Sequence, residues 1–565
     1  MIRMAFRNLA RHKVKTVLSI LAIAVSVAVY IFADAWIAGM TVDSKRNIVS
    51  YETGAAKLQA RLYFENLDDR PMYENFGGWE GYAGALDRAG YVSSPRFVFA
   101  GTLFSETGSA PVIFNAIDPR PDSRVLRIDS SVENGRYLRE GAFEIILGTM
   151  TADKLKLGIP MRPTRKELEE LISALPPGEG DFVRALYERA GKKPGGLFAP
   201  KAEPESGGNG RLFLRRDVSP ADRDRYWNML AEAGRMNARI STVIDLKAAP
   251  GMVRQERFES DLEPKFSAGE AELFRRAYEY DELTRAWYLA AGDPALTEEV
   301  LAAMVRADYS GAVRHVNQLI DVVLAGTINA PNPQLNNNTA FIPIDVLQDE
   351  AGLMLEGKVT ELVIRRQNAG DTALPGKYES PSFITAALEA ELGRPLPPEL
   401  GIFGWEGYVK DFIAAAAGDN WSTRIMTLIL FVLSFLGIAN TMLLAILERT
   451  REIGMMRAQG MSDARLVFTL TAEAGMAGLI GSLAGLALGC LINIPMVKYG
   501  IDFSAMTETM GGDIGYRVNG VFRSAWNGPV IIGSAAAATL IAASMALLPA
   551  LGILKTPLTE SLRDF

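Results

Sequence analysis

Charged residues are absent from four long stretches of the chain and frequent in most of the rest. The stretches without Asp, Glu, Lys or Arg are residues 16–33, 425–447, 474–497 and 524–554. An uncharged apolar stretch of at least about 18 residues is typical of a helix that crosses a membrane. We therefore expect four transmembrane helices, which cover residues 16–38, 425–447, 474–497 and 529–551.

The first stretch also has features of a cleavable signal peptide. Basic residues precede it, and Ala33-Asp34-Ala35 is similar to a signal-peptidase site. The apolar run is longer than that of a typical signal peptide, however, and Trp36-Ile37-Ala38 continues it beyond the possible cut. We therefore expect an uncleaved membrane span.

Basic residues predict the orientation of the spans. Residues 1–15 contain five Lys or Arg and no acid, and Arg449, Arg451, Arg457 and Arg465 lie in the loop 448–473. Lys and Arg concentrate on the cytoplasmic side of a membrane. The expected cytoplasmic parts are an amphipathic N-terminal helix at 1–15, the loop 448–473 and the tail 552–565. The expected extracytoplasmic parts are residues 39–424 and the loop 498–528.

The large segment 39–424 has the pattern of a mixed α and β domain. Alternating apolar residues at Ala110–Ala116 predict a strand, whereas Ser219-Pro220 and the capping box Ser267 to Glu270 predict helix starts. We expect β-rich parts at 53–158 and 315–420, interrupted by a helical insertion at 159–314. The expected fold is thus a membrane α-helical protein with four transmembrane helices. A large α+β extracytoplasmic domain is inserted between the first and second spans.

Composition excludes several classes of function. The single cysteine, Cys490, cannot form a disulfide within the chain, and with only two histidines a metal site of imidazole or thiolate is not expected. A formal net charge of −7 argues against nucleic-acid binding. The segment Gly352–Val359 is close to a phosphate-binding loop, but Val359 replaces the required Ser or Thr. We expect no catalytic residues, metal or cofactor in this chain.

Two further patterns concern helix contacts. Gly481, Gly485 and Gly489 recur every four residues in the third span, which lets a neighbouring helix approach closely.

A charged segment lies directly after the second span, and it reads Glu448-Arg449-Thr450-Arg451-Glu452-Ile453-Gly454-Met455-Met456-Arg457-Ala458-Gln459-Gly460. Its mixed charges and its final glycine predict a short amphipathic helix at the membrane surface. An ordinary charged loop that anchors the span is the simpler alternative.

This segment resembles the coupling-helix motif of the MacB/FtsX-like ABC transporter permease family, closest in kind to its lipoprotein-releasing (LolC/LolE-type) permeases. Residues Ala5–Lys13, Phe114–Pro119, Glu144–Gly148 and Pro549–Arg563 are also similar to parts of that family. The resemblance implies that ATPase-coupling residues are Glu448, Arg449, Arg451, Glu452, Ile453, Gly454, Met455, Met456, Arg457 and Gly460. The helical insertion at 159–314 is not a regular part of the family.

The resemblance also implies partners and a location. A separate cytoplasmic ABC ATPase subunit would hold ATP and Mg²⁺, and the permease would pair with a second copy or a related paralogue. The protein would lie in the cell inner membrane, among membrane lipids, with its large domain in the periplasm. We expect lipoprotein release from the inner membrane. The alternatives are MacB-like export of peptides or small molecules, mechanical activation of cell-wall hydrolases, and a membrane-anchored receptor or hydrolase without an ATPase.

For lipoprotein release, the resemblance implies that acyl chains lie between the first and second spans. The residues expected along this path are Phe32, Asp34, Trp36 and Met40 from the first span, and Trp421, Ile425, Met426 and Ile429 from the second. Trp36 and Trp421 also suit the simpler role of interfacial anchors. Asp34 is costly near a membrane core unless it meets a cation, water or a polar group of the cargo.

Overall fold

The computed structural model contains two compact units, each of which has its own core. Unit 1 comprises Met1–Lys45 and Val409–Phe565, and unit 2 comprises Arg46–Tyr408. The residues that the structure describes are 13–189, 212–215, 217–290, 293–349, 357–367, 374–426, 428–429, 450–502, 518 and 521–554. The expected N-terminal surface helix, most of the predicted second span and the tail after Leu554 therefore lie outside the described residues.

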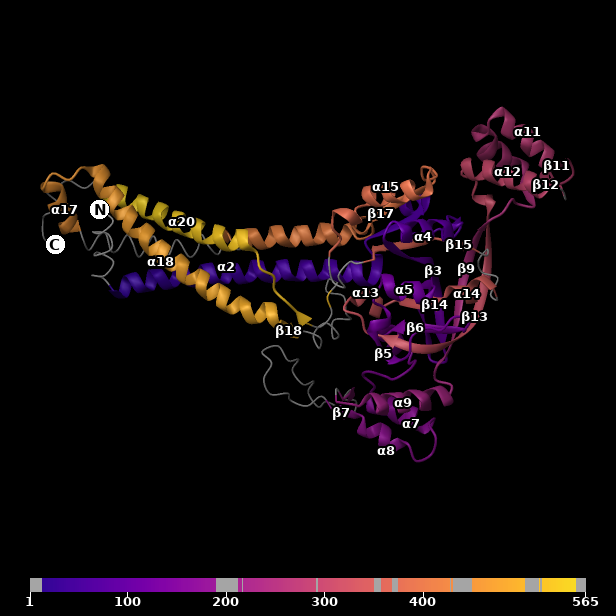
Figure 1. Ribbon diagram of the computed structural model, residues 1–565, viewed down its shortest axis with the longest axis horizontal. Helices are drawn as coiled ribbons and strands as arrows, with labels where there is room; N and C mark the ends of the chain where they lie inside the picture. The colour runs from indigo at the N-terminus through magenta and orange to yellow at the C-terminus, as the bar shows by residue number, and fades with distance from the viewer. Residues whose placement is uncertain are drawn as a thin grey trace. The chain divides into compact units, whose positions relative to one another are not determined.

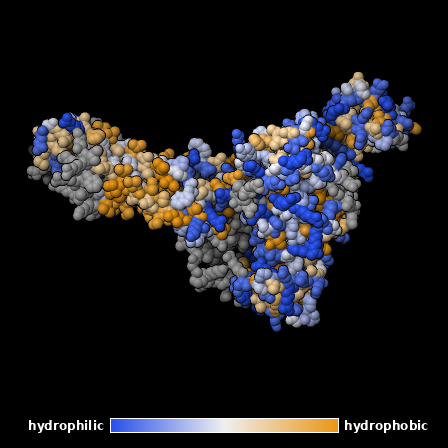
Figure 2. Space-filling view, viewed as in Figure 1, coloured by the Kyte–Doolittle hydropathy of each residue, from blue (hydrophilic) through white to orange (hydrophobic). Residues whose placement is uncertain are grey.

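Unit 1 is built from long apolar helices (Figure 1). These are α2 (Lys13–Ile48), whose last three residues belong to unit 2, α18 (Asp463–Lys498) and α20 (Gly528–Leu554), with the short α17 (Thr450–Ala458) before α18. Among the described residues, three helices are long and apolar enough to cross a membrane, at Thr16–Thr53, Asp463–Lys498 and Gly528–Gly552. Figure 2 shows the apolar surface that they expose. Helix α2, with 36 residues, is about 54 Å long and exceeds a hydrocarbon core of about 30 Å.

The remaining described part of unit 1 is a helix and two short strands. Residues 410–426 are helical, so this helix begins well before the predicted second span. Strands β18 (Ile501–Asp502) and β19 (Val521–Phe522) pair in antiparallel orientation and lie between α18 and α20 in the sequence. Residues 523–527 then lead from β19 into α20.

Unit 2 is organised around a ten-stranded mixed sheet. Its strands are β1 (Ala56–Ala60), β3 (Tyr91–Ser105), β4 (Gly108–Ile117), β5 (Val132–Gly135), β6 (Glu144–Gly148), β9 (Asn237–Lys247), β13 (Val313–Ile328), β14 (Thr339–Pro343), β16 (Glu361–Arg366) and β17 (Leu400–Gly404). Six of them close into a ring in the order β3-β4-β14-β6-β13-β9, because β9 pairs with both β13 and β3. Ring closure removes open strand edges within this part of the sheet.

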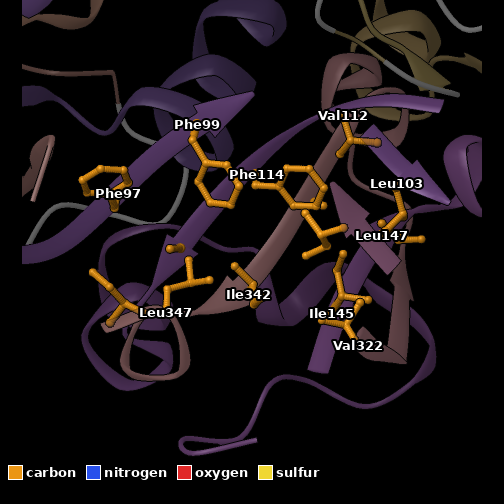
Figure 3. Close-up of a cluster of buried hydrophobic side chains, with 14 of the residues drawn as sticks. Phe97, Phe99, Leu103, Val112, Phe114, Ile145, Leu147, Val322, Ile342 and Leu347 are labelled. Atoms are coloured by element: carbon orange, nitrogen blue, oxygen red, sulfur yellow. The ribbon is translucent and has the colours of Figure 1, made fainter. Parts of the chain in front are cut away.

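Side chains of the ring strands contribute to the main core of unit 2, which also takes in residues of β1, β16, β17, α4, α9 and α15. Alternate residues of the ring strands point inward, as the period of two in a strand requires. Figure 3 shows Phe99 of β3 beside Phe114 of β4, whose rings stack with centroids 5.0 Å apart. Gly101 lies at the closure, where a Cβ would come within 2.9 Å of the Ser241 carbonyl oxygen.

The predicted helical insertion at 159–314 is not a single block. Its middle forms β9, which pairs with β13 over eleven positions from Asn237↔Val323 to Lys247↔Val313 and belongs to the main sheet. The sequence therefore makes two separate excursions, one before β9 and one after it. The first adds Leu168, Tyr226 and other side chains to the main core. The second, residues 248–312, encloses a core of its own around Phe258, Phe274 and Tyr278.

Short elements complete unit 2. Its helices are α3 (Arg61–Glu65), α4 (Trp79–Arg88), α5 (Pro119–Val125), α6 (Thr149–Lys154), α7 (Arg165–Ser173), α8 (Gly180–Ala185), α9 (Pro220–Glu232), α10 (Gln255–Arg257), α11 (Ala268–Ala277), α12 (Pro294–Arg306), α13 (Pro333–Asn336), α14 (Ile344–Asp349) and α15 (Pro381–Leu392). Paired short strands are β2 (Phe76–Gly77) with β15 (Lys358–Val359), β7 (Tyr187–Arg189) with β8 (Leu212–Leu214), and β10 (Met252–Arg254), β11 (Tyr278–Asp281) and β12 (Ala286–Leu289). The expected caps at Ser219 and Ser267 are present at the starts of α9 and α11.

Candidate functional site: the surface helix and the helix bundle of unit 1

Helix α17 ends in a turn that fixes the direction of the chain. Gly460 has φ +90°, which suits glycine, and its N–H donates to the Arg457 carbonyl at 3.0 Å. The Met461 N–H donates to the Met456 carbonyl at 3.1 Å. This pair of hydrogen bonds is the Schellman arrangement that satisfies the last carbonyls of a helix. The helix predicted from the charged segment is therefore present in its described part, and it stops at the predicted glycine.

One face of α17 packs against the two long helices that follow it. Ile453 is 2% exposed and shares an apolar cluster with Leu466 and Leu470 of α18 and Ala550 of α20. Met456 is partly buried against the same cluster. Burying a side chain such as Ile453 contributes about 1.5–3 kcal/mol. These contacts tie α17 to α18 and α20.

The opposite face of α17 is open. Met455 is 47% exposed, and Ala458 and Gln459 are exposed as well. Positions three and four residues apart lie on the same side of a helix, so these three residues form one surface. We call Met455, Ala458 and Gln459 the open face. Beside it, Arg457 Nε lies 3.3 Å from Asp463 Oδ1, an ion pair that links the end of α17 to the start of α18.

The remaining predicted coupling residues divide between the helix and its surroundings. Glu452 is half-buried and Gly454 is buried. Arg451 is helical, whereas Glu448 and Arg449 lie outside the described residues. The structure thus places Ile453 and Met456 in contacts within the chain, although the sequence motif had grouped them with residues that face a partner.

The three glycines of α18 lie against α2. A Cβ at Gly481 would come within 2.8 Å of Ile23 Cβ, and one at Gly485 within 2.5 Å of the Ala24 carbonyl oxygen. At Gly489 the nearest atom would be Ile31 Cβ, at 3.1 Å. Glycine at these positions allows the two helix backbones to approach closely.

The residues expected along an acyl-chain path do not share one environment. Residues 421–426 and 428–429 are helical, and Trp421, Ile425, Met426 and Ile429 among them are 66%, 52%, 62% and 53% exposed. On α2, Phe32 and Met40 are half-buried. Trp36 stacks on Phe522 of β19, with ring centroids 6.4 Å apart. Trp421, Ile425, Met426 and Ile429 are thus exposed, whereas Trp36 already has a partner within unit 1.

Asp34 also has a partner in the chain itself. Its Oδ2 accepts a hydrogen bond from Asn527 Nδ2 at 2.8 Å. Asn527 immediately precedes α20, and its carbonyl accepts from the Ile531 N–H. The carboxylate therefore lies at the N-terminal end of α20, where the helix dipole favours negative charge. The hydrogen bond from Asn527 gives the Asp34 carboxylate a polar partner within the chain, so no cargo group is required.

The comparison with known proteins bears directly on this part of the chain. Residues 424–558 match the FtsX-like permease C-terminal family. The matched FtsX-like region contains α17, α18 and α20. Together with the three long apolar helices, this match indicates a membrane protein.

Similar curated proteins are ABC transporter permeases. The macrolide export ATP-binding/permease protein MacB of Chromobacterium violaceum is 23% identical over 390 residues, which are 66% of this chain and 55% of MacB. YtrF, an ABC transporter permease of Bacillus subtilis, is 34% identical over 91 residues, 15% of this chain and 19% of YtrF. An uncharacterised ABC transporter permease of Methanocaldococcus jannaschii is 41% identical over 56 residues, 10% of this chain and 14% of the relative. The chain thus spans about half of MacB and less of the other two.

Several residues that organise the FtsX-like region were not predicted from the sequence. Asn493 of α18 is fully buried and Ser524 is 5% exposed, and the Ser524 hydroxyl donates to Asn493 Oδ1. An asparagine inside an otherwise apolar span is a signal that could have marked Asn493. No comparable signal marks Gly39, where a Cβ would lie 2.1 Å from the Arg523 carbonyl oxygen.

Proposed function

We propose that this chain is the permease subunit of an ABC transporter and that a cytoplasmic ATPase subunit binds the open face of α17. The observation that carries this proposal is the FtsX-like match at residues 424–558, together with the position of α17 inside it. The relatives named above are ABC transporter permeases, which supports the same function. In this proposal the ATP and its Mg²⁺ bind to the ATPase subunit, and a second permease completes the transporter.

The packing of α17 suits a helix that transmits the movement of a bound partner subunit to the rest of the chain. One face is fixed to α18 and α20 through Ile453, and the Arg457–Asp463 ion pair braces its end. The other face presents Met455 to solvent. Methionine adapts to irregular apolar surfaces, so Met455 suits a docking contact. Motion of the ATPase at the open face would thus act on the long helices directly.

The proposed location is the cell inner membrane, with unit 2 in the periplasm and α17 in the cytoplasm. A cysteine introduced as Ser219→Cys should react with an impermeant maleimide in intact spheroplasts, in a Cys490→Ala background. One introduced as Ser462→Cys should react only after lysis. Reaction of the Ser462→Cys variant in sealed spheroplasts would overturn this topology.

For the cargo we propose lipidated proteins, released from the inner membrane. The exposed apolar side chains at 421, 425, 426 and 429 support this choice, because acyl chains need an apolar surface that the protein itself leaves open. A second candidate function is export. It is favoured by the MacB relative, whose match covers 66% of this chain and whose name describes macrolide export.

Photocrosslinking separates these two cargoes. Photoreactive residues at 425 and 429 should capture acyl chains of a lipidated protein in native membranes, whereas one at the buried Ile31 should not. Capture of membrane phospholipid alone at 425 and 429 would reject lipoprotein release and leave export.

A further inference from the structure

A short segment crosses α2 next to the start of α20. Residues 521–527, which we call the clasp, include β19 and the five residues that follow it. The clasp backbone lies so close to α2 that a Cβ on Gly39 would be 2.1 Å from the Arg523 carbonyl oxygen and 2.6 Å from Ser524 Cα. The Ala525 N–H donates to the Ala35 carbonyl at 2.9 Å. Only glycine at position 39 allows this approach.

Side chains add two contacts between the clasp and α2. The Phe522 ring stacks on Trp36 with an interplanar angle of 12°. Asn527 donates to the Asp34 carboxylate at 2.8 Å. Because Asn527 immediately precedes α20 and its carbonyl accepts from the Ile531 N–H, this hydrogen bond joins α2 to the start of α20 as well as to the clasp.

The clasp binds α18 through one polar residue. The Ser524 hydroxyl donates to Asn493 Oδ1, and its backbone N–H donates to the Met496 carbonyl at 3.4 Å. Asn493 and Ser524 are 0% and 5% exposed, so separation of the two would leave buried polar groups unpaired. The clasp therefore contacts α2 and α18 and leads directly into α20.

Other contacts join the same helices over the rest of their length. Gly481, Gly485 and Gly489 of α18 pack on α2, and the Ser482 and Thr539 hydroxyls lie 3.0 Å apart between α18 and α20. Beyond these, Ile453 of α17 packs on α18 and α20. Away from the clasp, α2 is thus held to α18 by the glycine contacts, and α18 is held to α20 by the Ser482–Thr539 pair and by the packing of Ile453.

We propose that the clasp keeps α2, α18 and α20 together as one rigid body throughout the transport cycle, a role that rests on the proposed function. Asp34, Asn493, Ser524 and Asn527 are then positioning residues, which act by holding helices and not by touching cargo. A push on the open face of α17 moves the whole body. The clasp does not open to admit a substrate between α2 and α18.

An engineered disulfide tests whether the clasp stays closed. The pair Ala35→Cys and Ala525→Cys, in a Cys490→Ala background, places thiols on the two residues whose backbones are hydrogen-bonded. We expect crosslinking in native membranes at the same rate, within about twofold, in nucleotide-free and ATP-bound states. We also expect the locked complex with its co-purified ATPase to hydrolyse ATP within about twofold of the reduced complex. A loss of at least about tenfold that reduction restores would overturn the proposal.

Two glycine variants test the geometry. Gly39→Ala should slow the crosslinking of the same pair at least about fivefold, because its Cβ displaces the clasp backbone. Gly533→Ala on α20 is the matched control, since a Cβ there meets nothing within 4 Å, and it should leave the rate unchanged. Equal crosslinking in both variants would contradict the proposal. The comparison of these two glycine variants needs no ATPase, so failure to co-purify an ATPase would reject the proposed function and still leave the clasp geometry tested.

Discussion

The close approach of α2 and α18 makes a sharp prediction for Gly485→Ala. The new methyl group would lie 2.5 Å from the Ala24 carbonyl oxygen and 2.8 Å from Val27 Cβ, whereas ordinary contact begins at 3.4 Å. The nearest atom belongs to the backbone, so no side-chain rotation relieves the overlap. The two helices must therefore separate locally by about 0.9 Å, the difference between 3.4 and 2.5 Å.

The cost of this separation follows from overpacking of a tightly packed interface, which typically destabilises a protein by about 1–3 kcal/mol. A Gly→Ala change in an unobstructed helix is otherwise favourable by up to about 1 kcal/mol. Gly533→Ala provides that comparison within the same unit, because its methyl group meets nothing within 4 Å. We expect Gly485→Ala to be less stable than the original chain and Gly533→Ala to be equal to it or more stable.

The assay is reversible unfolding of the purified protein in mixed micelles with increasing dodecyl sulfate, followed by circular dichroism. Wild type and both variants are compared at the same protein and detergent concentrations. If Gly485→Ala proves as stable as Gly533→Ala, the contact between α18 and α2 does not exist as described, and the reasoning from the glycine spacing fails.

Three further predictions concern other parts of the chain. Asp34→Ala should lower the free energy of unfolding in the same assay by about 1–3 kcal/mol, because it leaves the Asn527 donor unpaired. Asp34→Asn keeps an acceptor and should cost less, and equal costs would contradict the pairing. The pKa of Glu167 is lowered to about 2, mainly by the hydrogen bond from the Thr164 N–H and then by Lys156, so the stability it contributes is present above about pH 4.5 and is lost as pH falls towards 2. Glu167→Gln should flatten the acid-unfolding curve of the full chain in that range, and an unchanged slope would refute this assignment. Replacement of residues 249–311 by Asn-Gly should leave the thermal unfolding of the rest of unit 2 nearly unchanged, because that excursion has a separate core. A shortened chain that fails to fold would show that the two cores depend on each other.

Local features of the fold were predictable from the sequence because their causes are local. The strand expected at Ala110–Ala116 corresponds to β4, and the capping box at Ser267 begins α11, since both depend on neighbouring residues. The extent of the helical insertion was wrong for the opposite reason. Strand β9 is identified by its pairing with β13, and Asn237 and its partner Val323 are far apart in the sequence.

The site shows the same division between local and distant causes. The turn at Gly460 that terminates α17 follows from a glycine at the close of an amphipathic segment. Which face of α17 is buried depends on Leu466 and Ala550, which lie in other helices. The partner of Asp34 is 493 residues away in the sequence, so no pattern near Asp34 could indicate Asn527.

Binding of the proposed ATPase to the open face of α17 is tested most directly by measuring its affinity for variants of that face. The ATPase that co-purifies with the tagged chain is titrated onto wild-type protein and onto Met455→Asp, which places a charge on the open face. Met252→Asp in unit 2 is the matched control, because Met252 is 44% exposed and Met455 is 47% exposed. We predict that Met455→Asp weakens binding at least about tenfold, or about 1.4 kcal/mol, and that Met252→Asp binds as the wild type does. Equal affinity of the two variants for the ATPase would contradict the account.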